Sequence, residues 1–197
     1  MSKPTSNGFS RRDFMRGSGA AAAASTVVHS ATAQDAAGSS NVIKGETSAT
    51  FKVNGKSMTA KVEPRTTLLD VLRYQFDLTA AKPVSSEGSS GASTVMIDGK
   101  LAMASTTLAL AAAGKEITTC ESLDESVPNA FVEHDAQQCG FCTPGFVVAV
   151  KAFVNKHPDA TVEQIRAGLN GNICRCGTYA NVLEAVVALV KGNQNGR

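Results

Sequence analysis

The first half of the chain alternates hydrophobic and polar residues, as strands with one buried face do. Apolar side chains occupy every second position in two runs around an Asn-Gly pair: Phe51, Val53, Met58, Ala60 and Val62. Asn54-Gly55 between two alternating runs is a strong signal for a β-hairpin. The pattern therefore predicts two antiparallel strands that begin near Ala49 and end before Pro64.

Helical and extended segments follow this hairpin. Apolar residues recur at helical spacing from Leu68 to Phe76. Three further segments come after a serine-rich loop: a strand over 94–97, a short helix over about 105–113 and a strand over 116–119. Hairpin, helix, loop, strand, helix and strand are in the order of a β-grasp domain, the small mixed-sheet architecture of plant-type ferredoxins. We therefore predict such a domain over residues 48–122.

The second half of the chain shows helical periodicity and no strand signal. Four helices are expected: one opening at Val127-Pro128, one from Pro144 to His157, one starting at Thr161, and one through Val182–Val190 that ends at Gly192. A pair of cysteines lies in the loop between the first two helices and another between the last two. The chain is thus predicted to be α+β, with a four-helix domain over residues 123–197.

An export signal precedes these elements, in residues 1–33. Arg11-Arg12 lies in the twin-arginine pattern SRRDFM, which directs export of already folded proteins in bacteria. The alanine-rich stretch that follows is shorter than the roughly 20 apolar residues of a membrane span. Ala31-Thr32-Ala33 is an A-x-A cleavage site, so the mature chain is expected to start near Gln34 in the periplasm. Residues 34–47 are small and polar and are interpreted as a linker.

Removal of the signal changes the charge of the chain. Residues 1–33 hold four of the 19 basic and one of the 17 acidic residues, which leaves 15 basic and 16 acidic residues and a net charge of −1. The overall excess of positive charge therefore belongs to the signal. No polybasic surface for nucleic acid or membrane lipid is expected.

Four of the five cysteines form two motifs. Cys139 and Cys142 lie in QCGFCTPGF, and Cys174 and Cys176 lie in GNICRCGTY. Thiolates from two tight, glycine-containing loops can hold an iron–sulfur cluster. The spacing alone also fits a structural zinc site. In an oxidising periplasm, four cysteines could instead form two disulfides and leave Cys120 free.

The residues around these cysteines resemble the small iron–sulfur subunit of the xanthine oxidase family of molybdenum hydroxylases, and especially the exported bacterial aldehyde dehydrogenase small subunits. The resemblance runs from FKVNGK through TTLLDVLR, GASTVMIDGK and KEITT to both cysteine motifs. It implies an electron-transfer subunit of an oxidoreductase. Hydroxylation would occur in a separate large subunit that holds the molybdopterin dinucleotide, beside one [2Fe–2S] cluster of this chain.

The resemblance also implies roles for single residues. The cluster nearest to molybdenum would be bound by Cys139, Cys142, Cys174 and Cys176. Gln138 would contact the pterin or its nucleotide tail, and Cys176 would lie against the pterin ring. Arg175 would support the site or contact the partner subunit. No catalytic residue is expected in this chain, because the active site lies in the partner.

Members of this family carry a second cluster in the β-grasp loop, which passes electrons outward, usually to a flavin subunit. At the matching ligand positions this chain has Ser85, Ser90, Ser93 and Ser105, and the first three keep the C-x4-C-x2-C spacing. A serine hydroxyl holds its proton tightly, and its hard oxygen suits iron–sulfur chemistry poorly. We therefore expect no cluster there. Serine at every ligand position fits deliberate replacement, whereas the neighbouring Ser86 and Ser89 favour natural loss.

The sequence thus predicts a periplasmic electron-transfer subunit of a molybdenum hydroxylase that oxidises aldehydes or N-heterocycles. Its electron acceptor would be a cytochrome near the remaining cluster or a flavin subunit. A structural subunit of the same complex and a zinc-binding module stay open as alternatives. His134 and His157 are expected to be structural or exposed, and Cys120 to be a small buried residue at a strand end.

Overall fold

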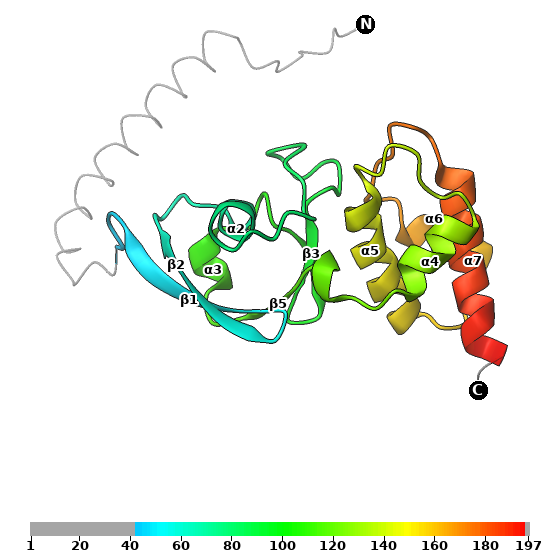
Figure 1. Cartoon of the computed structure of the whole chain (residues 1–197), viewed down its shortest axis with the longest axis horizontal. Coiled ribbons are helices and arrows are strands. Elements are labelled where there is room, and N and C mark those ends of the chain that lie inside the picture. Colours follow the sequence, from blue (N-terminus) through cyan, green and yellow to red (C-terminus); the bar gives the residue numbers. More distant parts are fainter. Residues whose placement is uncertain (1–41, 196–197) are drawn as a thin grey trace, which may run out of the picture. The chain divides into compact units, whose positions relative to one another are not determined.

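The computed structural model describes residues 42–195 and contains a five-stranded mixed sheet (Figure 1). The strands are β1 (Thr47–Val53), β2 (Lys56–Val62), β3 (Thr94–Ile97), β4 (Lys100–Met103) and β5 (Glu116–Thr118). Their order in the sheet is β2-β1-β5-β3-β4, and only β1 and β5 run parallel. The predicted signal peptide and residues 34–41 of the predicted linker lie outside the described residues.

Both hairpins of the sheet turn through two residues with positive φ. Asn54 and Gly55 connect β1 to β2, with φ of 51° and 76°, and Asp98 and Gly99 connect β3 to β4, with φ of 50° and 75°. Tight hairpins favour Asn-Gly and Asp-Gly because both central residues adopt the left-handed region. The predicted first hairpin is confirmed. Strand β4 was not predicted, although Asp98-Gly99 carries the same turn signal.

Short helices pack on the sheet and complete its core. They are α2 (Leu68–Asp70), a π-helical turn (Val71–Gln75), α3 (Ala109–Ala112) and, after β5, a 3-10 turn (Cys120–Ser122). The core contains Phe51, Leu72 and Ile117, none of them more than 1% exposed. The helix predicted over 105–113 begins only at Ala109, because Leu108 is extended and pairs with Thr67.

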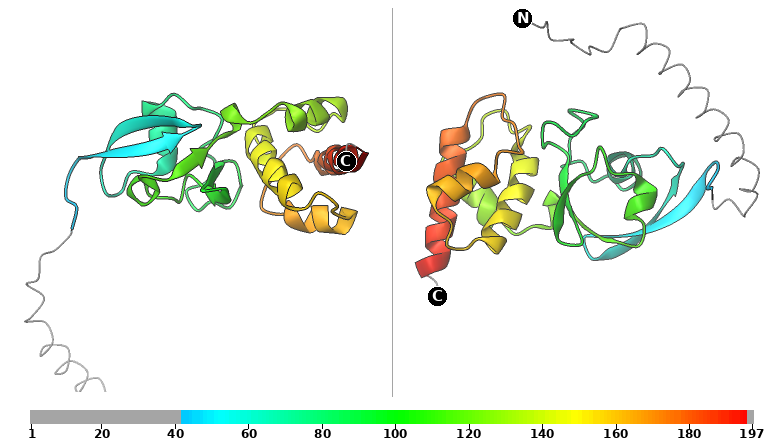
Figure 2. Two further views of the ribbon diagram at one scale, coloured as in Figure 1. Left: turned by 90° about the horizontal axis from the view of Figure 1, so that it is seen from below. Right: turned by 180° about the vertical axis from the view of Figure 1, so that it is seen from behind.

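Four helices form the second part of the described chain, as Figure 2 shows from two further directions. They are α4 (Ser126–Glu133), α5 (Thr143–Lys156), α6 (Val162–Gly168) and α7 (Tyr179–Asn195), and residues 123–195 contain no strand. Their own core includes Phe131, Phe146, Ile165 and Val186. Helix α7 was predicted to end at Gly192 but continues to Asn195. A single glycine costs a helix only about 1 kcal/mol and need not end it.

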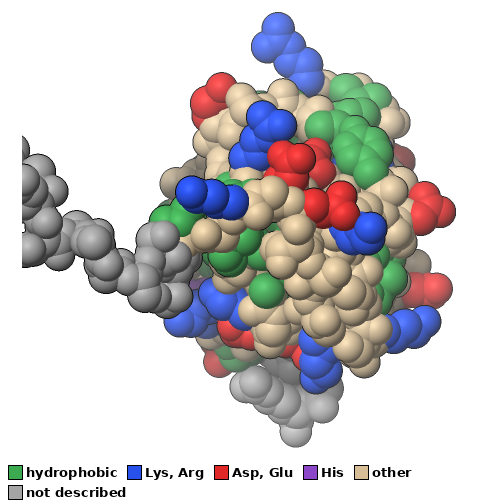
Figure 3. All heavy atoms as spheres, turned by 90° about the vertical axis from the view of Figure 1, so that its left-hand side faces the viewer, with side chains coloured by type: hydrophobic (Ala, Val, Ile, Leu, Met, Phe, Trp, Pro, Cys, Tyr) green, Lys and Arg blue, Asp and Glu red, His purple; other side chains and the backbone are tan. Residues whose placement is uncertain are grey.

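The described surface carries charges of both signs. Figure 3 shows basic and acidic side chains interspersed over one face of the molecule. Ion pairs such as Lys52–Glu116, at 2.5 Å, are exposed and therefore contribute little to stability. Within residues 42–195, no helix combines the length and the apolar character that crossing a membrane requires.

Candidate metal centre

The four cysteines of the two motifs lie in two loops that meet. Cys139 and Cys142 lie between α4 and α5, and Cys174 and Cys176 lie between α6 and α7. Their side chains interact in pairs that join the loops, Cys139 with Cys176 and Cys142 with Cys174. The fold therefore brings together the residues that the sequence predicts as ligands.

Local backbone geometry shapes both loops. The first loop leaves α4 through Asp135, which has a φ of 49°, and turns at Gly140, which has a φ of 75°. Pro144 then stands in the first turn of α5, where a missing N–H is tolerated. In the second loop, Gly177 has a φ of 80°, and its N–H donates to the carbonyl oxygen of Cys174 over 3.3 Å.

Two residues just after the second cysteine pair hold Cys174 in place. The Tyr179 hydroxyl accepts a hydrogen bond from the N–H of Cys174 over 2.8 Å. The Thr178 hydroxyl lies 3.3 Å from the Cys174 sulfur and donates to the carbonyl oxygen of Ala136, over 3.2 Å, just before the first cysteine pair. Neither residue was predicted to belong to the site, although they form the end of the GNICRCGTY motif.

The two cysteines of the more buried pair, Cys142 and Cys174, differ in pKa. Burial alone would raise the pKa of Cys174, but hydrogen bonds from the Thr178 hydroxyl and N–H and from Cys142 lower it to about 7. The pKa of Cys142 is raised to about 12, first by burial and then by its hydrogen bond to Cys174. Cys174 therefore loses its proton at a lower pH than Cys142 does.

The two cysteines of the exposed pair, Cys139 and Cys176, also have pKa values shifted in opposite directions. The backbone N–H of Phe141, followed by the Cys176 thiol, lowers the pKa of Cys139. The backbone N–H of Cys139 lowers the pKa of Cys176, but the side-chain hydrogen bond to Cys139, burial and neighbouring charge outweigh it and raise this pKa. In each pair one cysteine thus has a lowered pKa and the other a raised pKa, and binding of a metal group releases the remaining protons.

This arrangement fits a two-iron cluster better than a single ion. Within residues 42–195, no three His, Cys, Asp or Glu side chains converge closely enough to hold one metal ion. Structural zinc needs four ligands around one point. A [2Fe–2S] cluster is held by four thiolates on two irons, so two pairs of cysteines suit it. The donor set is therefore suited to an iron–sulfur cluster.

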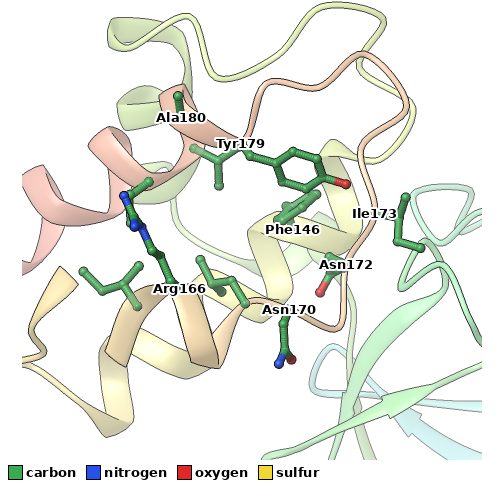
Figure 4. A pocket seen from close by; sticks show the side chains of 11 residues that line it. Phe146, Arg166, Asn170, Asn172, Ile173, Tyr179 and Ala180 are labelled. Carbon is green, nitrogen blue, oxygen red and sulfur yellow. The ribbon is translucent and has the colours of Figure 1, made fainter. Parts of the chain in front are cut away.

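The side chains around the cysteines include exposed apolar ones. Phe141, Ile173 and Tyr179 are 50%, 53% and 47% exposed. Ile173 and Tyr179 also line a cavity of about 580 Å³ between α5, α6 and α7, whose labelled side chains are shown in Figure 4. Gln138 and Arg175, which the resemblance places at the site, are both exposed.

The serines of the loop before β3 also lie in pairs. The hydroxyl oxygens of Ser85 and Ser90 are 3.4 Å apart, and those of Ser93 and Ser105 are 2.9 Å apart. Ser85, Ser90 and Ser93 belong to this loop and Ser105 follows β4, so the two pairs include all four predicted positions. Cys120 is half-buried directly after β5, and burial is the main cause that raises its pKa to about 11.

The two histidines expected to be structural lie at helix ends. His134 follows α4, and its carbonyl oxygen accepts a hydrogen bond from the Asn181 amide over 2.9 Å. His157 follows α5, and its ring lies 5.0 Å from the ring of Phe153.

Comparisons with known proteins identify the family of the chain. Residues 116–187 match the family model of the [2Fe-2S] binding domain, and residues 8–28 match the twin-arginine translocation signal. The aldehyde oxidoreductase iron-sulfur-binding subunit PaoA of Escherichia coli (strain K12) is 35% identical over 93% of this chain and 89% of that protein. The nicotine 6-hydroxylase small subunit of Paenarthrobacter nicotinovorans is 38% identical over 74% of this chain and 92% of that protein.

A solved structure shares the fold. One chain of quinoline 2-oxidoreductase from Pseudomonas putida 86 superposes with a TM-score of 0.72 and 32% identity, over 77% of this chain and 98% of that chain. The chain therefore belongs to the family of [2Fe–2S] iron–sulfur subunits of the molybdenum hydroxylases, whose catalytic site lies in a partner subunit. It is an electron-transfer subunit, and its twin-arginine signal directs it to the periplasm.

Proposed function

We propose that Cys139, Cys142, Cys174 and Cys176 bind the single [2Fe–2S] cluster of this chain. The observation that carries the proposal is their pairing across two loops, because the two pairs would together supply the four thiolates that such a cluster requires. When bound, such a cluster accepts and releases one electron at a time. The chain's own residues hold it and set its surroundings through the Thr178 hydroxyl and nearby backbone N–H groups.

We assign the cluster to a four-helix domain over residues 123–197 and the sheet to a β-grasp domain over residues 48–122. The strand order of the sheet, with parallel β1 and β5 at its centre, supports a likeness to plant-type ferredoxins. Separate hydrophobic cores in the two parts support the boundary near residue 122.

The large molybdopterin-binding subunit would dock on the face around Cys139 and Cys176. Both cysteines are exposed, and the half-exposed Phe141, Ile173 and Tyr179 lie beside them in sequence. Exposed apolar side chains near a redox site are typical of an interface. In this arrangement Gln138 and Cys176 contact the molybdopterin dinucleotide of the partner, and Arg175 contacts the partner itself.

We further propose that the complex hydroxylates aldehydes or N-heterocycles. The similar proteins named above come, by name, from an aldehyde oxidoreductase, a nicotine 6-hydroxylase and a quinoline 2-oxidoreductase. Co-purification of the full chain with a molybdenum-containing subunit, followed by turnover of an aldehyde and of an N-heterocycle, tests this. Activity on neither class contradicts the assignment of substrate.

The acceptor of the electrons would be a cytochrome that docks near the remaining cluster, in place of a flavin subunit reached through the serine loop. The loop and the residue after β4 that faces it offer hydroxyls, which do not replace thiolates as ligands of iron: Ser85, Ser90, Ser93 and Ser105. Electron transfer outward through this loop is therefore interrupted.

Metal analysis and low-temperature EPR of the reduced full chain test the cluster assignment. Two irons per chain and one rhombic [2Fe–2S] signal are expected, and Cys142→Ser should lose both. Cys120→Ser is the matched control and should keep both, because Cys120 lies outside the two loops. Four irons per chain contradict the single cluster. Zinc supports a zinc-binding module instead, and absence of metal supports a purely structural subunit.

A further inference from the structure

The serine loop, which we define as residues 85–93, contacts the loop that carries Cys174. The N–H of Ile173 donates to the carbonyl oxygen of Ser90 over 3.0 Å. The side-chain amide of the buried Asn172 donates to the carbonyl oxygen of Gly91, also over 3.0 Å. Two successive residues before Cys174 are thus held by two successive carbonyl groups of the serine loop.

This contact leaves no space for further atoms. Gly91 has a φ of +69°, and a Cβ there would lie 2.5 Å from the amide nitrogen of Asn172 and 2.6 Å from the carbonyl oxygen of Gly171. A Cβ on Gly145 of α5 would lie 2.4 Å from the carbonyl oxygen of Gly91 and 3.3 Å from the amide nitrogen of Asn172. The Gly91 carbonyl is therefore enclosed between α5 and the loop before Cys174.

The serine loop is itself fixed to the sheet. The Gly91 carbonyl oxygen also accepts from the hydroxyl of Thr94, over 2.6 Å, and Thr94 begins β3. The N–H of Ala104 donates to the carbonyl oxygen of Ser93 over 3.0 Å. Because its backbone is fixed to the sheet by these hydrogen bonds, the serine loop can hold the adjacent loop before Cys174 in one position.

We infer that the serine loop is a support for the remaining cluster, and that Asn172 is a positioning residue for the ligands Cys174 and Cys176. The inference rests on the proposed ligand set. The loop acts through the backbone carbonyls of Ser90 and Gly91, not through the serine hydroxyls. It therefore contributes to the electron-transfer site although it binds no cluster.

Substitution of Asn172 in the full chain tests this role. Asn172→Ala removes the amide that donates to Gly91, so Cys174 and Cys176 are less tightly held. We expect the variant to retain two irons but to shift the midpoint potential and the g values of the reduced cluster. The matched control is Asn170→Ala, two residues earlier in the same loop, since Asn170 is exposed and makes no hydrogen bond within the described part of the chain. It should match the wild type in both readouts.

A variant on the other side of the contact gives an independent result. Gly91→Ala places a methyl group against Asn172 and should shift the same two readouts in a protein whose Cys174 loop is unaltered. Identical potentials and g values for Asn172→Ala and the wild type overturn the inference. A wild type without iron overturns the ligand assignment instead, so the two failures are distinct.

One measurement needs no variant. In hydrogen–deuterium exchange of the wild-type chain, the Ile173 amide should exchange much more slowly than the exposed Arg175 amide of the same loop, because Ile173 donates to Ser90. Equal exchange rates for the two amides contradict the support, even if the Asn172 variants fail to fold.

Discussion

The hydroxyl of Thr178 lies 3.3 Å from the sulfur of Cys174 and 3.2 Å from the carbonyl oxygen of Ala136. A hydroxyl has one proton, so it donates to only one of these groups at a time. A protonated Cys174 can donate to Thr178, which then donates to Ala136. A thiolate at Cys174 attracts the hydroxyl proton more strongly, because hydrogen bonds to charged acceptors are the stronger ones. Thr178 therefore links the charge of Cys174 to the contact between the two cysteine loops.

Replacement of Thr178 should raise the pKa of Cys174 and so lower the fraction of Cys174 that is ionised near pH 7. Thr178→Val keeps the shape of the side chain but removes the hydroxyl donor, so the pKa of Cys174 should rise from about 7 toward the ordinary value of a cysteine. In the metal-free chain, the pH at which alkylation of Cys174 reaches half its maximal rate should move upward, as followed by mass spectrometry. Thr178→Ser retains the hydroxyl and should behave like the wild type. If the pH profiles of alkylation for Thr178→Val and the wild type superimpose, the role of Thr178 in lowering the pKa of Cys174 is contradicted.

The start of α4 should show a pH-dependent stability. The carboxylate of Asp124 accepts from Lys151 over 2.6 Å and from the N–H of Ser126 over 3.0 Å. These two partners, Lys151 first, hold the pKa of Asp124 well below its ordinary value. Because the folded pKa is the lower one, the stabilisation is complete above about pH 4 and is lost as the pH falls further.

Asp124→Asn should therefore lower the melting temperature at pH 7 and have a smaller effect near pH 2, where part of the stabilisation is already lost. Asp124 is more than half exposed, so solvent screening limits the loss to about 1 kcal/mol or less. Glu133→Gln, at the end of α4 and without an ion pair in the described structure, is the control and should leave melting unchanged at both pH values. If the loss of melting temperature caused by Asp124→Asn grows as the pH falls, the prediction is contradicted, because the pH dependence then has the opposite sign.

Gly145→Ala separates helix propensity from close packing. Alanine is favoured over glycine inside a helix by about 1 kcal/mol, so propensity alone predicts a more stable chain. The added Cβ would lie 2.4 Å from the Gly91 carbonyl oxygen, and overpacking of this kind costs about 1–3 kcal/mol. We expect the contact to outweigh the propensity, so that denaturant unfolding shows a net loss of stability.

The control for this substitution is Gly192→Ala in α7. Among the described residues, no atom outside the neighbouring helix backbone lies within 4 Å of a Cβ at that position, so propensity acts alone and the chain should gain stability. If Gly145→Ala also gains, the contact between α5 and the serine loop is looser than its geometry indicates.

Restoration of thiols should restore a cluster in the serine loop. The hydroxyls already lie in two pairs, 3.4 Å and 2.9 Å apart, which resembles the pairing of the four cysteines. Replacement of Ser85, Ser90, Ser93 and Ser105 by cysteine should raise the iron content from two to four per chain and add a second EPR signal. The variant that keeps serine at position 105 is the control and should stay near two. Two irons in the fourfold variant would show that the loop has lost more than its ligands.

Local sequence patterns correctly predicted those elements whose conformation depends mainly on residues close to one another in the chain. Asn54-Gly55 predicted the first hairpin because this pair adopts the left-handed backbone of a tight turn at little cost. The helix expected over 105–113 is shorter, because pairing of Leu108 with Thr67 holds the backbone extended. No pattern within a short window contains the partner of such a bridge.

The sequence by itself determined the class of this protein and the candidate ligands. Motifs with Cys139, Cys142, Cys174 and Cys176 are local, and the identity of each residue fixes its chemistry. Only the tertiary structure decided which cysteines pair. It also decided that the Thr178 hydroxyl lies against the Cys174 sulfur and that the Asn172 amide donates to the Gly91 carbonyl oxygen. These relations depend on how helices and a sheet pack across long separations in sequence. Packing is a property of the whole chain and not of any motif within it.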